Sequence, residues 1–496
     1  MPRRGTPPKR YAAAARGAFA PLLWRAVARR TLRGRPCCPP KRRKTFTNAE
    51  KYGTIVQNGA RARVAAGGTE LARFSGGVHP AGCKRTAGGG IGVCPAPARV
   101  YLPLARHIGK PALPVVEAGR RVRRGELVAA ADGRLSANVY ASVAGVVTGV
   151  VTHIEGSGKK APHVLIENDF SDESVQLAPL AERTPESVLA RIAEAGIVGM
   201  GGAGFPTAVK LDAGGRADVL VVNGAECEPY ITCDDSLMRA YTGELVQGIR
   251  LAMLACGARR AVVGIEKNKP QAVAALQAFC GQDIEVRPLR TRYPQGAEKQ
   301  LIYGCTGRVV PEGKLPADAG VVVVNVHTAL SIYKAVEENE PCSSRVMTVS
   351  GGACARPQDL WVPNGTPLRD LAEHCGGRED CARIVLGGPM MGEPVFSLKV
   401  CTGKTTSCLL FLDESECRER PVGPCIGCGR CVQACPMGLM PVFIEEALFA
   451  KDLDGAARFG APACIACGCC SYVCPAARQL APSVKLAKKL LRERKI

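Results

Sequence analysis

The chain has 496 residues, of which 46% are hydrophobic and 5% aromatic, and its formal net charge is +22. This length suffices for three or four domains with buried cores. The charge is concentrated at one end: residues 1–64 hold 17 Lys or Arg and a single acid, which leaves +6 for the other 432 residues. The basic balance therefore gives no argument for a nucleic-acid-binding protein.

The segment 1–64 is rich in Pro, Arg and Ala and lacks sustained amphipathic periodicity. We expect a disordered extension or a wrongly chosen start codon. A transit peptide and a polybasic contact with anionic lipid are the alternatives, and no role is assigned to it. No run of 18 apolar residues predicts a transmembrane helix.

Residues 65–170 are predicted to form an N-terminal region with a small β-barrel, because short apolar strands alternate with Gly-punctuated turns from Val100 to Val151. The pattern resembles the barrel-sandwich hybrid of lipoyl and biotinyl carrier domains. Those carriers modify a Lys at a hairpin tip, where this sequence has Arg134. Since Arg cannot form that amide linkage, the region is interpreted as structural.

The segment 171–340 alternates helical patterns with short β-branched strands that begin at Val219 and Val321, which indicates an α/β core with buried parallel strands. A capped amphipathic helix is expected from Thr184 to Gly196. In residues 341–416, a strand from Arg345, a Gly-Gly turn and a helix from about Leu368 favour a compact β-grasp fold.

Two cysteine runs in residues 417–480 have the spacing C-x2-C-x2-C-x3-C-P, which is typical of two-cluster 4Fe-4S ferredoxins, where the fourth Cys of each run ligates the other cluster. We therefore assign cluster one to Cys425, Cys428, Cys431 and Cys474, and cluster two to Cys464, Cys467, Cys470 and Cys435. The alternative is a pair of structural zinc sites, which usually use separated C-x2-C knuckles.

Cys469 lies between two ligands and is interpreted as a spectator, with substitution for Cys470 as the alternative. A helix from Phe443 and a second short helix are expected between the two runs. The basic segment 481–496 is predicted to be an amphipathic helix that docks on the protein, and membrane-surface contact is the alternative.

A Gly-rich loop from Gly199 to Thr207 precedes Lys210, and such a loop lets backbone amides approach phosphate. Polar motifs follow at or near strand ends: Asn223-Gly-Ala-Glu-Cys-Glu-Pro, Tyr293-Pro-Gln-Gly-Ala-Glu-Lys and Asn325-Val-His-Thr. Ligand contacts in α/β folds gather at these ends. For each piece alone, a structural turn or a solvated loop is the alternative.

The Gly-rich loop and the Glu-x-Glu-Pro motif resemble the FMN- and NADH-binding flavoprotein of respiratory complex I. The motifs at Phe74, His107 and Tyr293, with the order barrel, flavoprotein core, β-grasp and twin-cluster ferredoxin, look closer still to the RnfC family of the Rnf electron-transport complex. The resemblance covers about Phe74 to Ile496. It implies a multidomain α/β and α+β protein with a barrel-sandwich hybrid, a Rossmann-like FMN/NADH core, an SLBB-like β-grasp domain and a helical ferredoxin domain.

By this resemblance, a set of residues would hold FMN and NADH: Gly201, Gly202, Gly204, Phe205, Lys210, Asn223, Glu226, Glu228, Gly296, Glu298, Lys299, Asn325 and Thr328. Lys299 departs from the second Glu of the complex I motif. No catalytic acid or base is expected, and His79, His107 and His327 are as readily structural as functional.

The resemblance implies a peripheral, electron-input subunit on the cytoplasmic face of a bacterial inner membrane. NADH would reduce FMN, two 4Fe-4S clusters would pass single electrons to membrane components of the Rnf A, B, D, E and G type, and ion transport would couple NADH to ferredoxin. The alternatives are a soluble NADH-dependent flavoprotein that feeds a hydrogenase or another cytosolic acceptor, and a non-enzymatic iron–sulfur redox sensor. The coupling ion, the direction of electron flow and the cluster potentials are not determined by the sequence.

Overall fold

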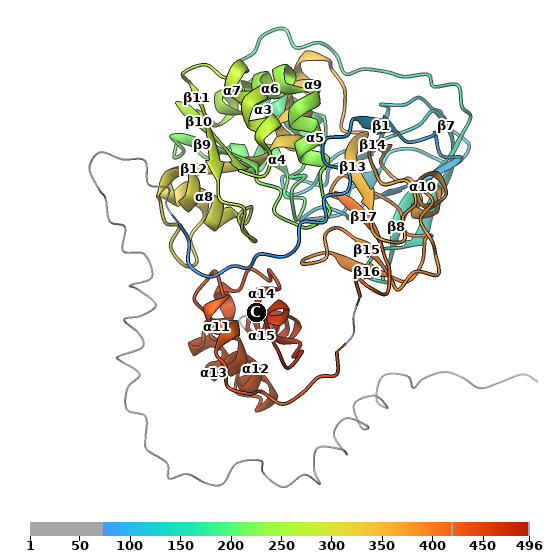
Figure 1. Cartoon of the computed structure of the whole chain (residues 1–496). Helices are drawn as coiled ribbons and strands as arrows, with labels where there is room; N and C mark the ends of the chain where they lie inside the picture. Colours follow the sequence, from blue (N-terminus) through green and yellow to red (C-terminus); the bar gives the residue numbers. More distant parts are fainter. Residues whose placement is uncertain (1–72, 418–419, 495–496) are drawn as a thin grey trace, which may run out of the picture. The chain divides into compact units, whose positions relative to one another are not determined.

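The computed structural model describes residues 73–417 and 420–494 (Figure 1). The predicted basic extension over residues 1–64 lies outside the described residues. The described part is mixed α/β and contains four β-sheets and a C-terminal group of helices.

Two antiparallel sheets build the barrel region, with the strand orders β2-β8-β7-β4 and β3-β5-β6. Their strands are β2 (Arg99–Pro103), β3 (Leu113–Pro114), β4 (Arg121–Val122), β5 (Leu127–Ala130), β6 (Val139–Tyr140), β7 (Gly145–Ile154) and β8 (Lys160–Asn168). Alternate residues such as Val100 and Leu102 point inward and are at most 1% exposed, which follows from the period-two geometry of a strand. The predicted barrel of short strands is therefore confirmed.

A four-stranded parallel sheet with the order β11-β10-β9-β12 forms the centre of the next region. Its strands are β9 (Val219–Gly224), β10 (Arg260–Glu266), β11 (Ile284–Leu289) and β12 (Val321–Asn325). The runs that begin at Val219 and Val321 are β-branched and buried, and they pair side by side, as the sequence predicted.

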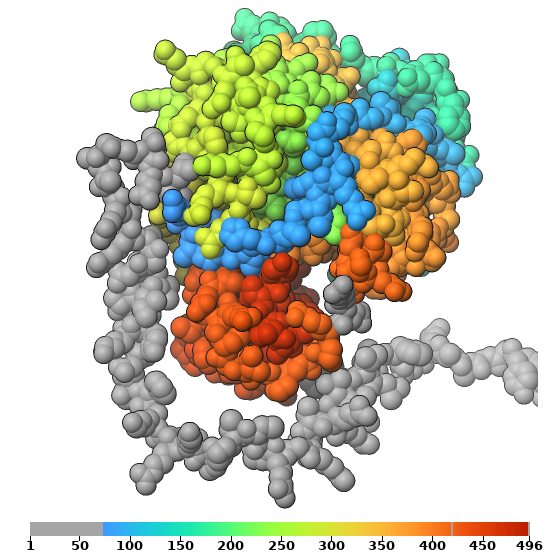
Figure 2. Space-filling view, in the orientation of Figure 1, coloured from blue at the N-terminus to red at the C-terminus, as the bar shows by residue number. Residues whose placement is uncertain are grey.

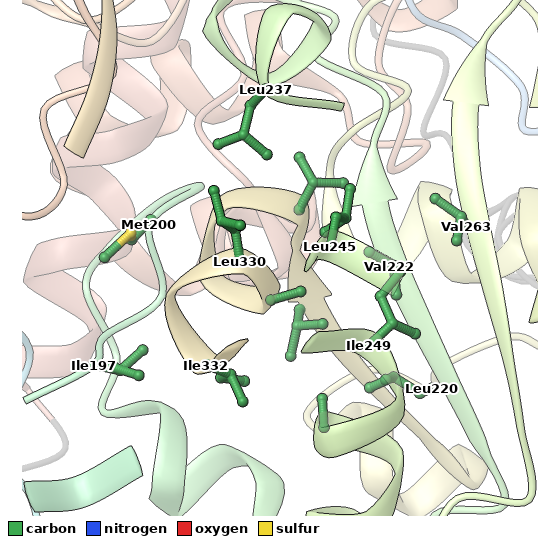
Figure 3. Close-up of a cluster of buried hydrophobic side chains, with 14 of the residues drawn as sticks. Ile197, Met200, Leu220, Val222, Leu237, Leu245, Ile249, Val263, Leu330 and Ile332 are labelled. Atoms are coloured by element: carbon green, nitrogen blue, oxygen red, sulfur yellow. The ribbon is translucent and has the colours of Figure 1, made fainter. Parts of the chain in front are cut away.

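Helices cover both faces of this sheet (Figure 1). One face packs on α3 (Pro185–Glu194), α5 (Cys233–Ala240), α6 (Thr242–Cys256), α7 (Pro270–Phe279) and α9 (Val326–Glu337), and the other on α8 (Glu298–Thr306). Figure 3 shows the larger core, in which Leu220 and Val222 of β9 meet Leu245 and Ile249 of α6. The predicted capped helix is confirmed as α3, because the Thr184 side chain accepts from the Ser187 amide and Gly196 follows with a φ of +66°.

A mixed six-stranded sheet has the order β1-β14-β13-β17-β15-β16. Its elements are β1 (Ile91–Val93), β13 (Ser344–Ser350), β14 (Gln358–Pro363), α10 (Leu368–Cys375), β15 (Arg383–Leu386), β16 (Glu393–Val395) and β17 (Cys408–Leu412). The predicted strand from Arg345 and helix from Leu368 are both present. The sequence did not predict β1, which precedes the barrel strands and pairs in parallel with β14.

Short helices make up the C-terminal region. They are α11 (Arg430–Gln433), α12 (Pro441–Phe449), α13 (Leu453–Arg458), α14 (Cys469–Tyr472) and α15 (Leu480–Glu493). The predicted C-terminal helix is α15, which packs on α12 and α13 and buries Val484, Ala487 and Leu491. Leu486, which the sequence placed on the same apolar face, is instead 48% exposed.

Gly248 marks a close approach between α6 and α9. A Cβ at this position would lie 2.1 Å from the Ala329 carbonyl oxygen of α9. We expect Gly248→Ala to lower the free energy of unfolding by about 1–3 kcal/mol, because the two helices must separate to admit the methyl group. Urea unfolding followed by circular dichroism measures this change.

Gly243→Ala is the matched control in the same helix, since its Cβ would lie 3.6 Å from the nearest atom, Phe279 Cε1. It is expected to leave stability unchanged or to raise it slightly. Equal losses in the two variants would contradict the close approach.

Candidate functional site

The carboxyl ends of β9 and β12 form the first part of the site. Asn223 and Asn325 are paired neighbours in the sheet, and Asn325 Nδ2 donates to the Asn223 carbonyl at 3.3 Å. Asn223 Nδ2 in turn donates to the Gly296 carbonyl at 3.0 Å. A Cβ on Gly201 would lie 3.0 Å from the Asn325 side chain. Four of the predicted residues, from four separate motifs, are therefore brought together at one edge of the sheet.

The Gly-rich loop runs along this edge and is held at both ends. The Gly199 amide donates to the Phe205 carbonyl at 2.9 Å, and the Met200 amide donates to Thr328 Oγ1 at 3.0 Å. Gly204 has a φ of +69°, and its carbonyl accepts from the Ile108 amide of the barrel region. At Gly202 a Cβ would meet no atom within 4 Å, so this part of the loop has open space beside it.

Asn325 also fixes the helix that follows it. Its Oδ1 accepts from the His327 amide at 2.8 Å as the N-cap of α9, and its Nδ2 donates to Asp234 Oδ2 at 2.7 Å. His327 is 1% exposed, and burial holds its pKa well below the ordinary range. A buried neutral imidazole of this kind supports its interpretation as a structural residue.

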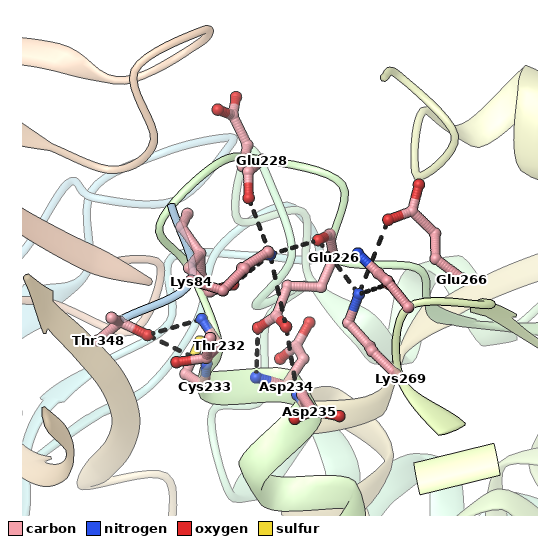
Figure 4. Close-up of polar contacts among 12 residues, drawn as sticks. Lys84, Glu226, Glu228, Thr232, Cys233, Asp234, Asp235, Glu266, Lys269 and Thr348 are labelled. Atoms are coloured by element: carbon pink, nitrogen blue, oxygen red, sulfur yellow. Dashed lines mark hydrogen bonds and ion pairs between the residues drawn. The ribbon is translucent and has the colours of Figure 1, made fainter. Parts of the chain in front are cut away.

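Two lysines hold the loop that carries the Glu-Cys-Glu motif (Figure 4). Lys84 Nζ donates to the carbonyls of Glu226 and Glu228 at 2.9 and 3.0 Å and also contacts the Ile231 carbonyl. Lys269 Nζ donates to the Ala225 carbonyl at 2.7 Å. Because a loop cannot satisfy its own inward-pointing carbonyls, these ammonium groups fix its path.

The Glu226 side chain points into the protein. Its Oε1 accepts from the Asp234 amide at 2.6 Å, and Lys84 Nζ lies 4.0 Å from its Oε2. Burial raises the pKa of Glu226 to about 8, against the opposing effects of Lys84 and Lys269. This carboxyl therefore supports the loop from beneath and is itself poorly placed for solvent.

Glu228 points in a different direction, toward the loop before β16. Its Oε2 accepts from the Met390 amide at 3.1 Å, and its Oε1 is buried without a hydrogen-bond partner. Burial raises the pKa of Glu228 to about 7, although the Met390 and Met391 amides and Tyr293 oppose the shift. A buried carboxyl with a free oxygen atom is a site for a proton or for a ligand donor.

The predicted residues on α4 (Thr207–Leu211) and at the start of α8 are less closely gathered. Lys210 Nζ pairs with Glu298 Oε1 at 2.7 Å, whereas Lys299 Nζ points away to the Pro311 carbonyl at 3.0 Å. Lys210 and Glu298 thus lie together, and Lys299 is directed to the loop after α8.

The cysteines assigned to cluster two face one cavity. Cys435, Cys464, Cys467 and Cys470 all line it, together with the fully buried Cys469. The Leu439 amide donates to Cys435 Sγ and the Ala466 amide to Cys464 Sγ, both at 3.3 Å. Four thiols around one cavity, with amide donors to their sulfurs, fit a cubane cluster.

The cysteines assigned to cluster one lie nearer to solvent. Cys425 and Cys428 are exposed, whereas Cys431 and Cys474 are buried with Leu480 in one small apolar cluster. Arg478 lies close to both Cys425 and Cys474, so the fourth Cys of the second run approaches the first run. This neighbourhood supports the exchange of fourth ligands between the runs.

Contacts from the rest of the chain fall on the loops of cluster two. Tyr293 Oη donates to the Cys467 carbonyl at 2.7 Å, and Gln300 Nε2 donates to the Pro436 carbonyl at 3.2 Å. The Gly77 amide donates to the Ala434 carbonyl at 2.9 Å. The motif that begins at Tyr293 therefore touches both the sheet edge, through Gly296, and the second cysteine run.

Lys84, Asp234 and Lys269 are site residues that sequence reasoning missed. Lys84 comes from a loop far away in sequence, and no pattern around it indicates its target. Asp234 follows the Glu-Cys-Glu motif closely enough that an extended motif could have included it. Among the described residues, no helix has both the length and the apolar character that crossing a bilayer requires.

Three family models match the chain. Residues 72–171 match the RnfC barrel sandwich hybrid domain, residues 192–334 the Nuo51 FMN-binding domain, and residues 420–475 the 4Fe-4S dicluster domain. Together with the sheet edge and the cysteine cavity, these matches define the class: a multidomain protein that combines a flavin-binding type of domain with a two-cluster ferredoxin type of domain.

Relatives that match most of the chain narrow the class to one family. The RnfC-type component of the ion-translocating oxidoreductase complex of Rhodobacter capsulatus is 43% identical over 78% of this chain and 76% of its own. The corresponding component of the proton-translocating ferredoxin:NAD(+) oxidoreductase complex of Clostridium ljungdahlii is 43% identical over 77% and 86%. That of the Na(+)-translocating complex of Acetobacterium woodii is 40% identical over 75% and 86%. The chain belongs to the RnfC family.

The raised pKa of Glu228 gives a testable pH dependence. The folded carboxyl, with a pKa of about 7, binds a proton more tightly than the ordinary carboxyl at 4.5. The folded state therefore holds more protons between these values, and stability falls as pH rises from 4.5 through 7. Glu228→Gln lacks this term, so at pH 8 it should be more stable than the wild type by up to about 3 kcal/mol.

At pH 5 the two proteins are expected to differ little, because the wild-type carboxyl is then largely protonated. Urea unfolding at several pH values between 4.5 and 8 measures the difference. The control is Glu312→Gln at an exposed position, which should follow the wild type. A difference between wild type and Glu228→Gln that is independent of pH would contradict the assignment.

Proposed function

We propose that this chain is the electron-input subunit of a membrane-bound, ion-translocating ferredoxin:NAD(+) oxidoreductase complex, on the cytoplasmic face of the bacterial inner membrane. NADH is its substrate, FMN and two 4Fe-4S clusters are its cofactors, and the other Rnf subunits are its partners. When bound, FMN exchanges hydride with the nicotinamide and single electrons with the cubanes. Family membership supports this proposal, and so does the FMN-binding type of domain.

The chain's own residues would position the nucleotides at the edge where β9 and β12 end. Gly201, Gly202, Gly204 and Phe205 border the open part of the Gly-rich loop, and Asn325 and Thr328 hold that loop against the sheet. Gly296 and Asn223 close the edge from the other side. These contacts support the assignment of FMN and its phosphate to this edge.

The remaining proposed residues have different tasks. Lys210, paired with Glu298, would offer a cation beside the loop. Glu226 would hold the Glu-Cys-Glu loop from beneath, and the free oxygen of Glu228 would face the nicotinamide and flavin side. Lys299 contributes only through its charge, because its ammonium group is directed to Pro311.

The domain limits and finer fold names form part of the proposal. The parallel sheet with helices on both faces supports a Rossmann-like core over 171–340. The third sheet supports an SLBB-like β-grasp over 341–416, because β13, β14, β15, β16 and β17 lie in the spatial order second, first, fifth, third, fourth, with a helix after the second strand. The barrel is proposed over 65–170 and the ferredoxin over 417–480, followed by the C-terminal helix.

We further infer that electrons pass between the flavin and cluster two before they reach cluster one. The observation that carries the proposal is the hydrogen bond from Tyr293 Oη to the Cys467 carbonyl. It joins a motif of the nucleotide edge to a ligand of cluster two. The exposed Cys425 and Cys428 of cluster one would then face the membrane partners.

Anaerobically reconstituted full-length protein tests the function. It should contain one FMN and about eight iron atoms, four for each cubane. Addition of NADH should bleach both the flavin and the cluster absorbance, and an artificial acceptor should restore them. A protein that binds zinc in place of iron, or whose chromophores do not respond to NADH, would contradict the proposal.

Ligand substitutions test the order of the clusters. In Cys428→Ser, NADH is expected to reduce the flavin and cluster two, as seen by electron paramagnetic resonance, while electron delivery to an external protein acceptor falls. In Cys467→Ser, NADH should reduce the flavin alone and leave cluster one oxidised. The reverse result, with cluster one reduced in Cys467→Ser, would reverse the order.

A further inference from the structure

The C-terminal helix α15 brings one ammonium group to a ligand of cluster two. The helix docks through Leu480, Val484, Ala487 and Leu491, which are buried against α12 and α13. Lys488 follows Ala487, and its Nζ donates to the Cys464 carbonyl at 2.5 Å. A residue near the end of the chain is thus bound to the backbone of a predicted iron ligand.

The charge of Lys488 has no acidic partner. Its neighbour in sequence, Lys489, pairs with Glu493, and Arg494 pairs with Asp454. No carboxylate among the described residues pairs with Lys488. The charged groups that act on it are the cations Arg492 and Lys299, besides the Cys464 thiol itself.

We propose that Lys488 raises the reduction potential of the cluster held by Cys435, Cys464, Cys467 and Cys470. This inference rests on the proposed function, which supplies both the cluster and the electron. Reduction adds one electron, and hence one negative charge, to the cluster, and no proton is required for the step. An uncompensated ammonium group beside a ligand residue stabilises the added charge more than it stabilises the oxidised form.

The position of Lys488 makes this effect stronger than that of a surface lysine. The side chain is half-buried between α15 and the second cysteine run, so solvent and salt screen it less. Charge and hydrogen bonding around the ligands are known levers on cluster potentials. The second cysteine run therefore receives from α15 a charge that the cysteine motif itself does not contain.

The role of α15 follows from this arrangement. The helix is basic, and without a target its charge would be an unspecific surface property. Docking through its apolar face selects Lys488 from among Lys485, Lys488 and Lys489 as the residue that reaches the Cys464 carbonyl. The helix thereby acts as a positioning element for the electron carrier nearest to the nucleotide edge.

A series of substitutions in the full-length, anaerobically reconstituted protein tests the inference. Lys488→Gln removes the charge and keeps a hydrogen-bond donor, Lys488→Met removes both, Lys488→Glu reverses the charge, and Lys488→Arg conserves it. Redox titration followed by electron paramagnetic resonance measures the midpoint potential of each cluster. The control is Lys489→Met in the same helix, whose side chain is 71% exposed.

We expect Lys488→Gln and Lys488→Met to lower the equilibrium constant for reduction of one cluster about tenfold, which corresponds to about 59 mV for one electron. Lys488→Glu should shift it further in the same direction, whereas Lys488→Arg and Lys489→Met should leave it unchanged. A purely structural role would not order the variants by charge.

Two kinds of failure are distinguishable. If the wild-type protein binds no cubanes, the proposed function itself is wrong. If cubanes assemble and the Gln and Arg variants have equal midpoint potentials, the function stands and the role of Lys488 is overturned. Should Lys488→Met fail to assemble its clusters, Lys488→Gln still decides, because it retains a donor for the Cys464 carbonyl.

Discussion

The hydrogen bond between Tyr293 and the Cys467 carbonyl is the constraint on which the proposed electron path depends. Tyr293 is 2% exposed and lies in one apolar cluster with Val78, Cys467 and Cys469. The bond is buried, so water does not compete for the Cys467 carbonyl. Because Gly296 of the same motif is bonded to Asn223, a movement at the sheet edge would be transmitted to the second cysteine run within a span of four residues.

A single extended segment ties the regions of the chain together. Residues 74–94 contact the ferredoxin region at Ala434, the nucleotide core at Tyr293 and the Glu-Cys-Glu loop, and the third sheet through β1. Figure 2 shows this segment running across the surface of the described molecule. Lys84 lies at its centre and binds three carbonyls of one loop. The segment acts through backbone and ammonium contacts and needs little apolar area of its own.

The sequence predicted local features well and distant contacts poorly. The cysteine spacing, the helix capped by Thr184 and the β-branched strands at Val219 and Val321 are local patterns with a direct physical cause, and the structure has each of them. The gathering of Asn223, Gly296 and Asn325 follows from the rule that parallel strands end at one edge. The partners of Lys84 and the pairing of β1 with β14 depend on contacts between residues more than 140 positions apart, which no periodicity encodes.

The insertion of β1 also constrains how the chain folds during synthesis. β1 leaves the ribosome about as early as the barrel strands, but its partner β14 is made more than 260 residues later. Since domains generally fold as they emerge, the barrel can close while β1 remains without a partner. The third sheet is completed only by this early strand, so the barrel and the β-grasp region are separate in architecture and coupled in maturation. An isolated β-grasp segment would expose the edge of β14, a surface prone to pairing with other chains.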